Sequence, residues 1–165
     1  MRKPLTPLQA VLYGGLTVGV LDILEAIVFW GFRGVSPVRV FQGIASGLLG
    51  RDSFSGGAPT AILGAILHFF IAFMAVKFYF LVSEWISALR QRPLLWGPIY
   101  GVSVYLVMYL IVLPLSAARA PAFGAVNVAN GLFAHIFCVG IPAALFARAA
   151  GDPSAAAAAA KPSAL

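Results

Sequence analysis

Two acids and two histidines lie within stretches of the chain that are otherwise apolar. Asp22 and Glu25 are three residues apart in the first such stretch, and His68 and His135 lie in the second and the fourth. A spacing of three residues places both carboxylates on one face of a helix. Because ionisable groups are costly in hydrocarbon, we expect these side chains to face a partner, a cavity or water. They are the candidate functional residues of this sequence.

Carboxylates near imidazoles support three kinds of chemistry. They can relay protons through a membrane. Asp, Glu and His side chains also bind zinc, iron or manganese, and two histidines on different helices can ligate one haem. In a competing interpretation, the same groups only fix helix packing through interhelical hydrogen bonds. The sequence leaves these interpretations open and identifies no metal or cofactor.

The composition indicates that lipid is the solvent for much of the surface. Of the 165 residues, 61% are hydrophobic and 10% are charged, whereas a water-soluble domain carries about 25% charged residues. The net charge of +6 comes from Lys and Arg residues scattered singly along the chain, so we expect no nucleic-acid partner. The sequence has no nucleotide-binding, zinc-ribbon or nucleophile-elbow motif. Any enzymatic chemistry would have to occur in the membrane.

Four apolar stretches are long enough to cross a bilayer as helices, which takes about 20 residues each. They cover residues 8–32, 60–82, 94–115 and 122–147. The sequence therefore predicts an all-α, polytopic membrane protein. Residues 1–150 would form a single transmembrane domain, a four-helix bundle. Residues 151–165, rich in alanine, would form a disordered cytoplasmic tail.

The distribution of Lys and Arg predicts the orientation. One side of the bundle would carry Arg2, Lys3, Arg90, Arg92, Arg148 and Lys161, and the other Arg33, Arg39, Arg51 and Arg119. Cytoplasmic flanks are the richer ones in Lys and Arg. We therefore expect a multi-pass protein of a bacterial inner membrane with both termini in the cytoplasm.

A short amphipathic helix is predicted at residues 36–49, between the first two spans. Ser36 followed by Pro37 is typical of a helix start, and apolar residues then recur at spacings of three and four. The helix is too short to span the bilayer, so it would lie at the interface or enter it partway. Its polar residues Arg39 and Gln42, with Arg51 after it, are candidates for a gate over the polar residues of the spans.

Depth counting brings those polar residues into one layer. With a rise of about 1.5 Å per residue, Glu25 and His68 lie about 10–12 Å deep, Asp22 about 15 Å and His135 about 18 Å. Small residues flank both histidines at spacings of four, which favours close helix packing. The predicted intramembrane cluster consists of Asp22, Glu25, His68, His135, Asn127 and Asn130. Cys138, three residues after His135, fits either a shared ligand or a small apolar filler.

The segment around the amphipathic helix carries a resemblance. The run of residues 36–50, SPVRVFQGIASGLLG, is followed by Phe54-Ser55-Gly56-Gly57 and by the histidine of the second span. This pattern resembles a group of small uncharacterised four-helix bacterial inner-membrane proteins. The resemblance implies the fold and the location but no activity.

Taken together, the sequence favours a small transporter, or a permeation module for protons or a solute, working in the lipid bilayer as a homo-oligomer. One alternative is a non-catalytic accessory or structural membrane protein. The other is a membrane redox protein that binds metal or haem, in which Asp22, Glu25, His68 and His135 would be the ligands.

Overall fold

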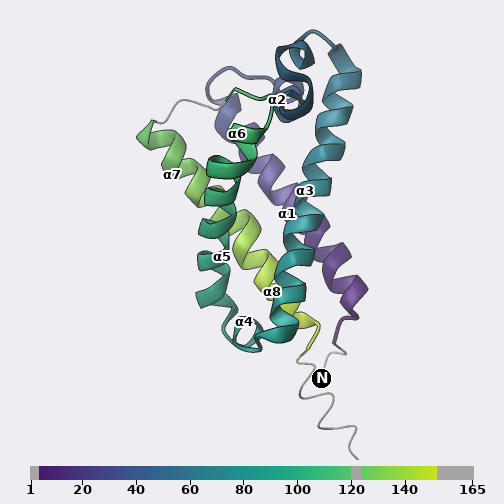
Figure 1. The fold of residues 1–165 in the computed structure, drawn as a ribbon, viewed down its shortest axis with the longest axis vertical. Coiled ribbons are helices and arrows are strands. Elements are labelled where there is room, and N and C mark those ends of the chain that lie inside the picture. Colours follow the sequence, from purple (N-terminus) through teal and green to yellow (C-terminus); the bar gives the residue numbers. More distant parts are fainter. Residues whose placement is uncertain (1–3, 120–123, 152–165) are drawn as a thin grey trace, which may run out of the picture.

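The computed structural model describes residues 4–119 and 124–151, and all secondary structure in these residues is helical (Figure 1). Four helical stretches are long and apolar enough to cross a membrane: Pro7–Gly31, Gly57–Trp85, Pro93–Leu115 and Ala125–Ala149. The predicted helical class and the four long apolar helices are therefore confirmed. The predicted tail lies outside the described residues, apart from Gly151.

The helices follow one another in this order: α1 (Pro7–Gly31), α2 (Pro37–Leu49), the 3₁₀ helix η1 (Gly50–Phe54), α3 (Gly57–Trp85), α4 (Ala88–Gln91), α5 (Pro93–Val107), the π-helix η2 (Met108–Val112), α6 (Leu113–Leu115), α7 (Ala125–Ala134), the π-helix η3 (His135–Gly140) and α8 (Ile141–Ala149). The third span thus consists of α5, η2 and α6. The fourth consists of α7, η3 and α8.

The two ends of the bundle differ. The start of α1, the short helix α4 and the end of α8 lie together at one end, which we call the terminal end (Figure 1). Helix α2 and the start of α7 lie at the other end, which we call the α2 end. At the terminal end the Leu5 amide donates to the Ala149 carbonyl over 2.9 Å, which ties the first span to the last.

Local sequence explains where the helices begin. Thr6 and Gln9 form a reciprocal capping box ahead of α1, with Pro7 at the first position. Helix α2 begins as its Ser36-Pro37 start predicts, because the Ser36 hydroxyl accepts from the Arg39 amide. These caps satisfy amide groups that have no partner within the helix.

The segment between α2 and α3 is more regular than expected. The sequence predicts a span at residues 60–82, with no regular structure between it and the amphipathic helix. Instead η1 continues directly from α2, and α3 begins at Gly57, whose φ of 62° is in the left-handed region that favours glycine. Helix α3 is consequently longer at both ends than predicted. The short helix α4 was not predicted.

Both π-helices end two residues before a proline. Helix η2 ends at Val112, before Pro114, and η3 ends at Gly140, before Pro142. Proline has no N–H group to donate, and its ring clashes with the carbonyl four residues earlier. A widened turn relieves that clash and lets the helix continue. The prolines therefore adjust these two spans without breaking them.

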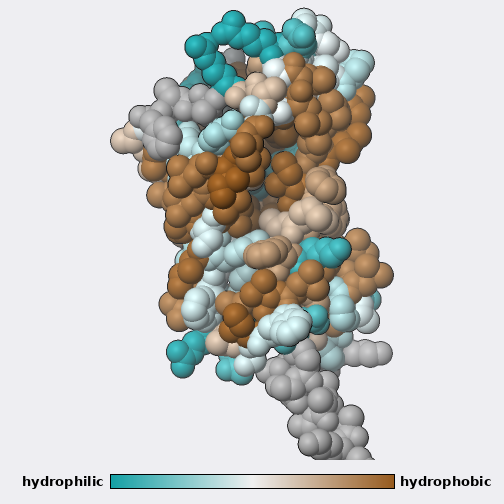
Figure 2. Space-filling model, in the orientation of Figure 1, coloured by the Kyte–Doolittle hydropathy of each residue, from teal (hydrophilic) through white to brown (hydrophobic). Residues whose placement is uncertain are grey.

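The outer surface of the bundle is largely apolar. Figure 2 shows hydrophobic residues over much of the length of the molecule and hydrophilic residues gathered mainly at the α2 end. Large apolar side chains such as Leu16, Ile66 and Leu110 are more than half exposed. Lipid chains can cover such a surface, whereas water cannot do so without a large cost.

Candidate functional site

The centre of the candidate site is a pairing between α1 and α3. The Nδ1 atom of His68 lies 4.0 Å from the Oδ2 atom of Asp22. The Nε2 atom of the same ring lies 2.8 Å from the carbonyl oxygen of Gly19, one turn earlier on α1. His68 is 8% exposed. The imidazole is therefore held to α1 through Nε2, and its Nδ1 atom faces the Asp22 carboxylate.

His68 lies on a buried face of α3 between two small residues. Gly64, His68 and Ala72 recur every four residues and are all buried, as their spacing predicts. On the opposing helix, Gly19 has no side chain, and an ideal Cβ there would meet the Phe69 ring at 2.5 Å. The absence of side-chain bulk lets the helices approach closely enough for the ring to reach a main-chain carbonyl.

Two further groups from the fourth span complete the site. The Asn130 side chain lies within hydrogen-bonding reach of the Glu25 carboxylate. The negative charge of Asp22 also acts on this carboxylate. The thiol of Cys138 interacts electrostatically with both carboxylates. Asn130, Glu25, Asp22 and Cys138 are all partly buried. The partly buried carboxylates of α1 thus have neighbours on α3, α7 and η3.

The contacts of His135 lie elsewhere, on its own helix and on α5. Its Nδ1 atom lies 2.8 Å from the Gly131 carbonyl of its own helix. Its ring stands edge-on to Tyr105 of α5, with the centroids 5.5 Å apart. Helix rotation explains the difference: Asn130 and Cys138 face α1, whereas Gly131 and His135 face α5.

This separation bears on the metal and haem interpretations. In residues 4–119 and 124–151, no three His, Cys, Asp or Glu side chains lie close enough to hold a metal ion. The two histidines contact different neighbouring helices, α1 for His68 and α5 for His135. The described residues therefore offer no set of three ligands for the metal considered above.

The candidate gate residues lie at the α2 end. Gln42 is 4% exposed, and its Nε2 atom donates to the Gly57 carbonyl over 3.1 Å, which ties α2 to the start of α3. Arg39 donates to the Phe54 carbonyl over 3.4 Å and lies over the ring of the same residue. Arg51 is exposed. Asn127, the remaining predicted cluster residue, is half-buried on α7.

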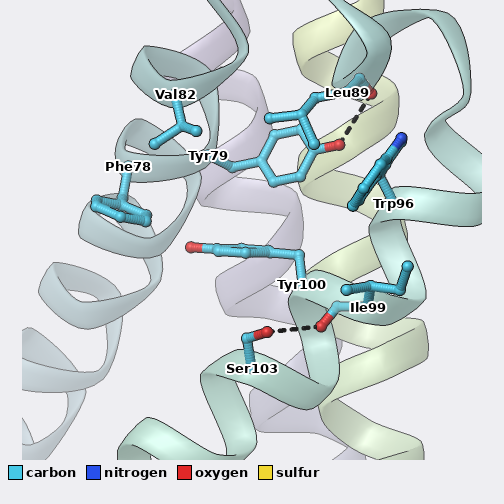
Figure 3. A pocket seen from close by; sticks show the side chains of 8 residues that line it. All are labelled: Phe78, Tyr79, Val82, Leu89, Trp96, Ile99, Tyr100 and Ser103. Atoms are coloured by element: carbon cyan, nitrogen blue, oxygen red, sulfur yellow. Dashed lines mark hydrogen bonds between the residues drawn. The ribbon is translucent and has the colours of Figure 1, made fainter. Parts of the chain in front are cut away.

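An apolar hollow between α3, α4 and α5 contains none of the predicted residues (Figure 3). Its volume is about 140 Å³. Its hydroxyl groups are already engaged with the main chain. Tyr79 donates to the Leu89 carbonyl, Tyr100 to the Ala75 carbonyl, and Ser103 to the Ile99 carbonyl. The hollow therefore presents mainly aromatic and aliphatic surface.

Three participants near the candidate residues are not in the predicted cluster. Cys138 was considered only as a ligand shared with His135 or as an apolar filler, although it shares a helix face with Asn130, eight residues earlier, and this spacing is visible in the sequence. The contact of His68 with the Gly19 carbonyl could not be predicted, because every residue has a main-chain carbonyl and the sequence does not show which one His68 reaches. Tyr105 is 5% exposed, and its hydroxyl has no hydrogen-bond partner among the residues that the structure describes. Its role beside His135 depends on how two spans pack.

Comparison with models of known protein families, with curated proteins and with solved structures finds no match.

Proposed function

We propose that this protein is a small membrane permeation module that moves protons, or a solute together with protons, by way of Asp22 and His68. The observation that carries the proposal is the 4.0 Å approach of Nδ1 of His68 to Oδ2 of Asp22 within two apolar spans. Ionisable side chains inside a membrane domain commonly belong to ion and proton pathways.

The hydrogen bond to Gly19 determines where the exchangeable proton lies. A carbonyl oxygen only accepts, so Nε2 of His68 carries a hydrogen. In a neutral imidazole, Nδ1 is then an acceptor and faces a carboxylate oxygen, which is also an acceptor. The contact between the Asp22 carboxylate and Nδ1 of His68 is favourable when one of these two groups carries a proton.

Transfer within the pair requires a small rearrangement. A hydrogen bond between nitrogen and oxygen spans about 2.7–3.2 Å, and the observed separation is 4.0 Å. A side-chain movement of about 1 Å, or one bridging water, closes this gap. Glu25, coupled to Asp22 through its charge and held by Asn130, is the next acceptor along α1. The relay would run from the imidazole to Asp22 and from Asp22 to Glu25.

We further propose that the bundle lies in a bacterial inner membrane with the terminal end in the cytoplasm. The terminal end carries Arg90, Arg92 and Arg148, and Arg2, Lys3 and Lys161 flank it in the sequence, against Arg33, Arg39, Arg51 and Arg119 at the α2 end. Cytoplasmic loops are enriched in Lys and Arg. Because four short spans enclose little space, the module would work as a homo-oligomer.

The test is proton flux in vesicles that contain purified protein and a pH-sensitive dye. A potassium gradient with valinomycin supplies the driving force. Asp22→Asn keeps the size of the side chain and removes its charge, so flux should fall at least about tenfold. Asp52→Asn, the same change at an exposed residue of the α2 end, should leave flux unchanged. Equal flux in the wild type and Asp22→Asn would refute the relay.

A second candidate, a non-catalytic accessory or structural protein, is favoured by the bond between His68 and Gly19. In that function the imidazole only joins α1 to α3. His68→Gln separates the two candidates, because the glutamine amide can still donate to the carbonyl but cannot relay a proton. The relay predicts a folded protein without flux. The structural function predicts that wild type and variant are alike in both thermal stability and flux.

A further inference from the structure

A polar hollow lies at the α2 end, away from the Asp22 and His68 pair. It has a volume of about 280 Å³ and is formed where the end of α2 and η1 meet the segment after α6. Ser46, Gly50 and Phe54 line it on one side and Ala117 and Ala118 on the other. A main-chain hydrogen bond of 2.9 Å from Ala117 to Gly47 holds the two sides together. The hollow is therefore built by segments about 70 residues apart.

Two arginines line this hollow, one from each side. Arg51 comes from η1, and Arg119 comes from the segment after α6. Both are exposed. Because each guanidinium group carries five donors and a permanent charge, the pair presents a strongly cationic rim to any molecule that enters.

The other arginines of the α2 end are already engaged. Arg33 donates to the Phe29 carbonyl over 3.0 Å, and its guanidinium carbon lies 3.8 Å from the centroid of the Phe29 ring. Arg39 is held by the carbonyl and the ring of Phe54. Within residues 4–119 and 124–151, neither Arg51 nor Arg119 has an acidic, carbonyl or aromatic partner. Asp52 is the one acid of this end, and it forms no ion pair in the described residues.

We propose that Arg51 and Arg119 bind a phosphate group in this hollow. Arginine matches phosphate oxygens with paired hydrogen bonds, and two arginines on opposite walls can hold one phosphate between them. The volume of about 280 Å³ suits a phosphate with a short attached group such as glycerol. It is too small for a folded partner.

At this location, two kinds of molecule can supply the phosphate group. The hollow lies at the end of four apolar helices and beside the amphipathic helix α2, the level at which lipid phosphates lie if these helices span a bilayer. The phosphate can therefore belong to an anionic lipid headgroup or to a soluble phosphate ester. Both satisfy the two guanidinium groups, and the experiment distinguishes them.

Binding is measured on purified full-length protein with two sets of probes. Native mass spectrometry measures retention of short-chain phosphatidylglycerol against phosphatidylcholine, and calorimetry measures binding of inorganic phosphate and glycerol 3-phosphate. The double variant Arg51→Gln with Arg119→Gln should weaken binding of the preferred probe at least about tenfold, since it removes both charge-assisted contacts. Preference for the lipid identifies a headgroup site, and preference for a soluble ester identifies a solute site.

The matched control is the single variant Arg33→Gln, which removes one charge from the same end and contacts no residue that lines the hollow. It should bind as the wild type does, whereas Arg51→Gln and Arg119→Gln should each bind more weakly. An equal loss in Arg33→Gln and in either of those single variants would mean a diffuse electrostatic effect and would overturn the proposal. So would a wild-type protein that binds neither set of probes. Each single variant, Arg51→Gln or Arg119→Gln, should bind at an intermediate strength, which provides a milder test if a double variant folds poorly.

Discussion

Gly140 of η3 and Gly101 of α5 lie back to back where the third and fourth spans cross. An ideal Cβ atom on Gly140 would lie 2.9 Å from the Cα atom of Gly101, closer than real Cβ contacts. The crossing is therefore a contact between two backbones. It also fixes the rotation of η3, which turns His135 towards α5 and Cys138 towards α1.

Gly140→Ala should lower the free energy of unfolding in detergent by about 1–3 kcal/mol, because the added methyl group has to push main-chain atoms apart. Gly43→Ala is the control, since a Cβ at that helical position meets nothing within 4 Å. It should be neutral or stabilising, because alanine favours helix. Similar melting temperatures for Gly140→Ala and Gly43→Ala would show that the two backbones do not pack this closely where the spans cross.

Gly64→Ala should disrupt the packing of α2 against α3. A Cβ on Gly64 would overlap the carbonyl of Phe41 in α2, and main chain cannot move aside as a flexible side chain can. We expect faster amide hydrogen exchange throughout α2, with the four spans still protected. The control is Gly31→Ala, where a Cβ has open space. Unchanged protection of α2 would contradict this packing.

Arg90→Met should destabilise the terminal end. Arg90 is 4% exposed; its Nε atom donates to the Ser83 hydroxyl over 2.8 Å, and its Nη1 atom donates to the Gly151 carbonyl over 2.7 Å. Methionine fills the space but leaves the carbonyl without a donor, at a cost of about 1–3 kcal/mol. Thermal unfolding in detergent measures the loss. Arg92→Met, at an exposed position, should cost much less. Equal costs would argue against this role of Arg90.

Tyr105→Phe should leave the protein as stable or make it up to about 1 kcal/mol more stable. The hydroxyl of Tyr105 is buried and has no hydrogen-bond partner within residues 4–119 and 124–151. Phenylalanine retains the ring contacts with Tyr109 and His135. Tyr100→Phe is the comparison, because it removes a 2.7 Å bond to the Ala75 carbonyl and should cost about 1 kcal/mol. Equal losses would mean that Tyr105 bonds to an ordered water.

The sequence by itself determined the class of the protein and the start of its amphipathic helix. Span length and apolarity are local properties, and so is the Ser36-Pro37 cap, because each acts within a few residues of the chain. For the same reason the burial of Gly64, His68 and Ala72 follows from their spacing alone.

Only the tertiary structure decided which polar residues meet. His68 lies against Gly19 and Asp22 because α1 and α3 approach closely at their small residues, and His135 faces Tyr105 because η3 and α5 cross at Gly140 and Gly101. Depth counting along a helix gives the level of a side chain in the bundle but not the direction in which it points. That direction depends on how each helix is rotated against its neighbours, which a single span does not encode.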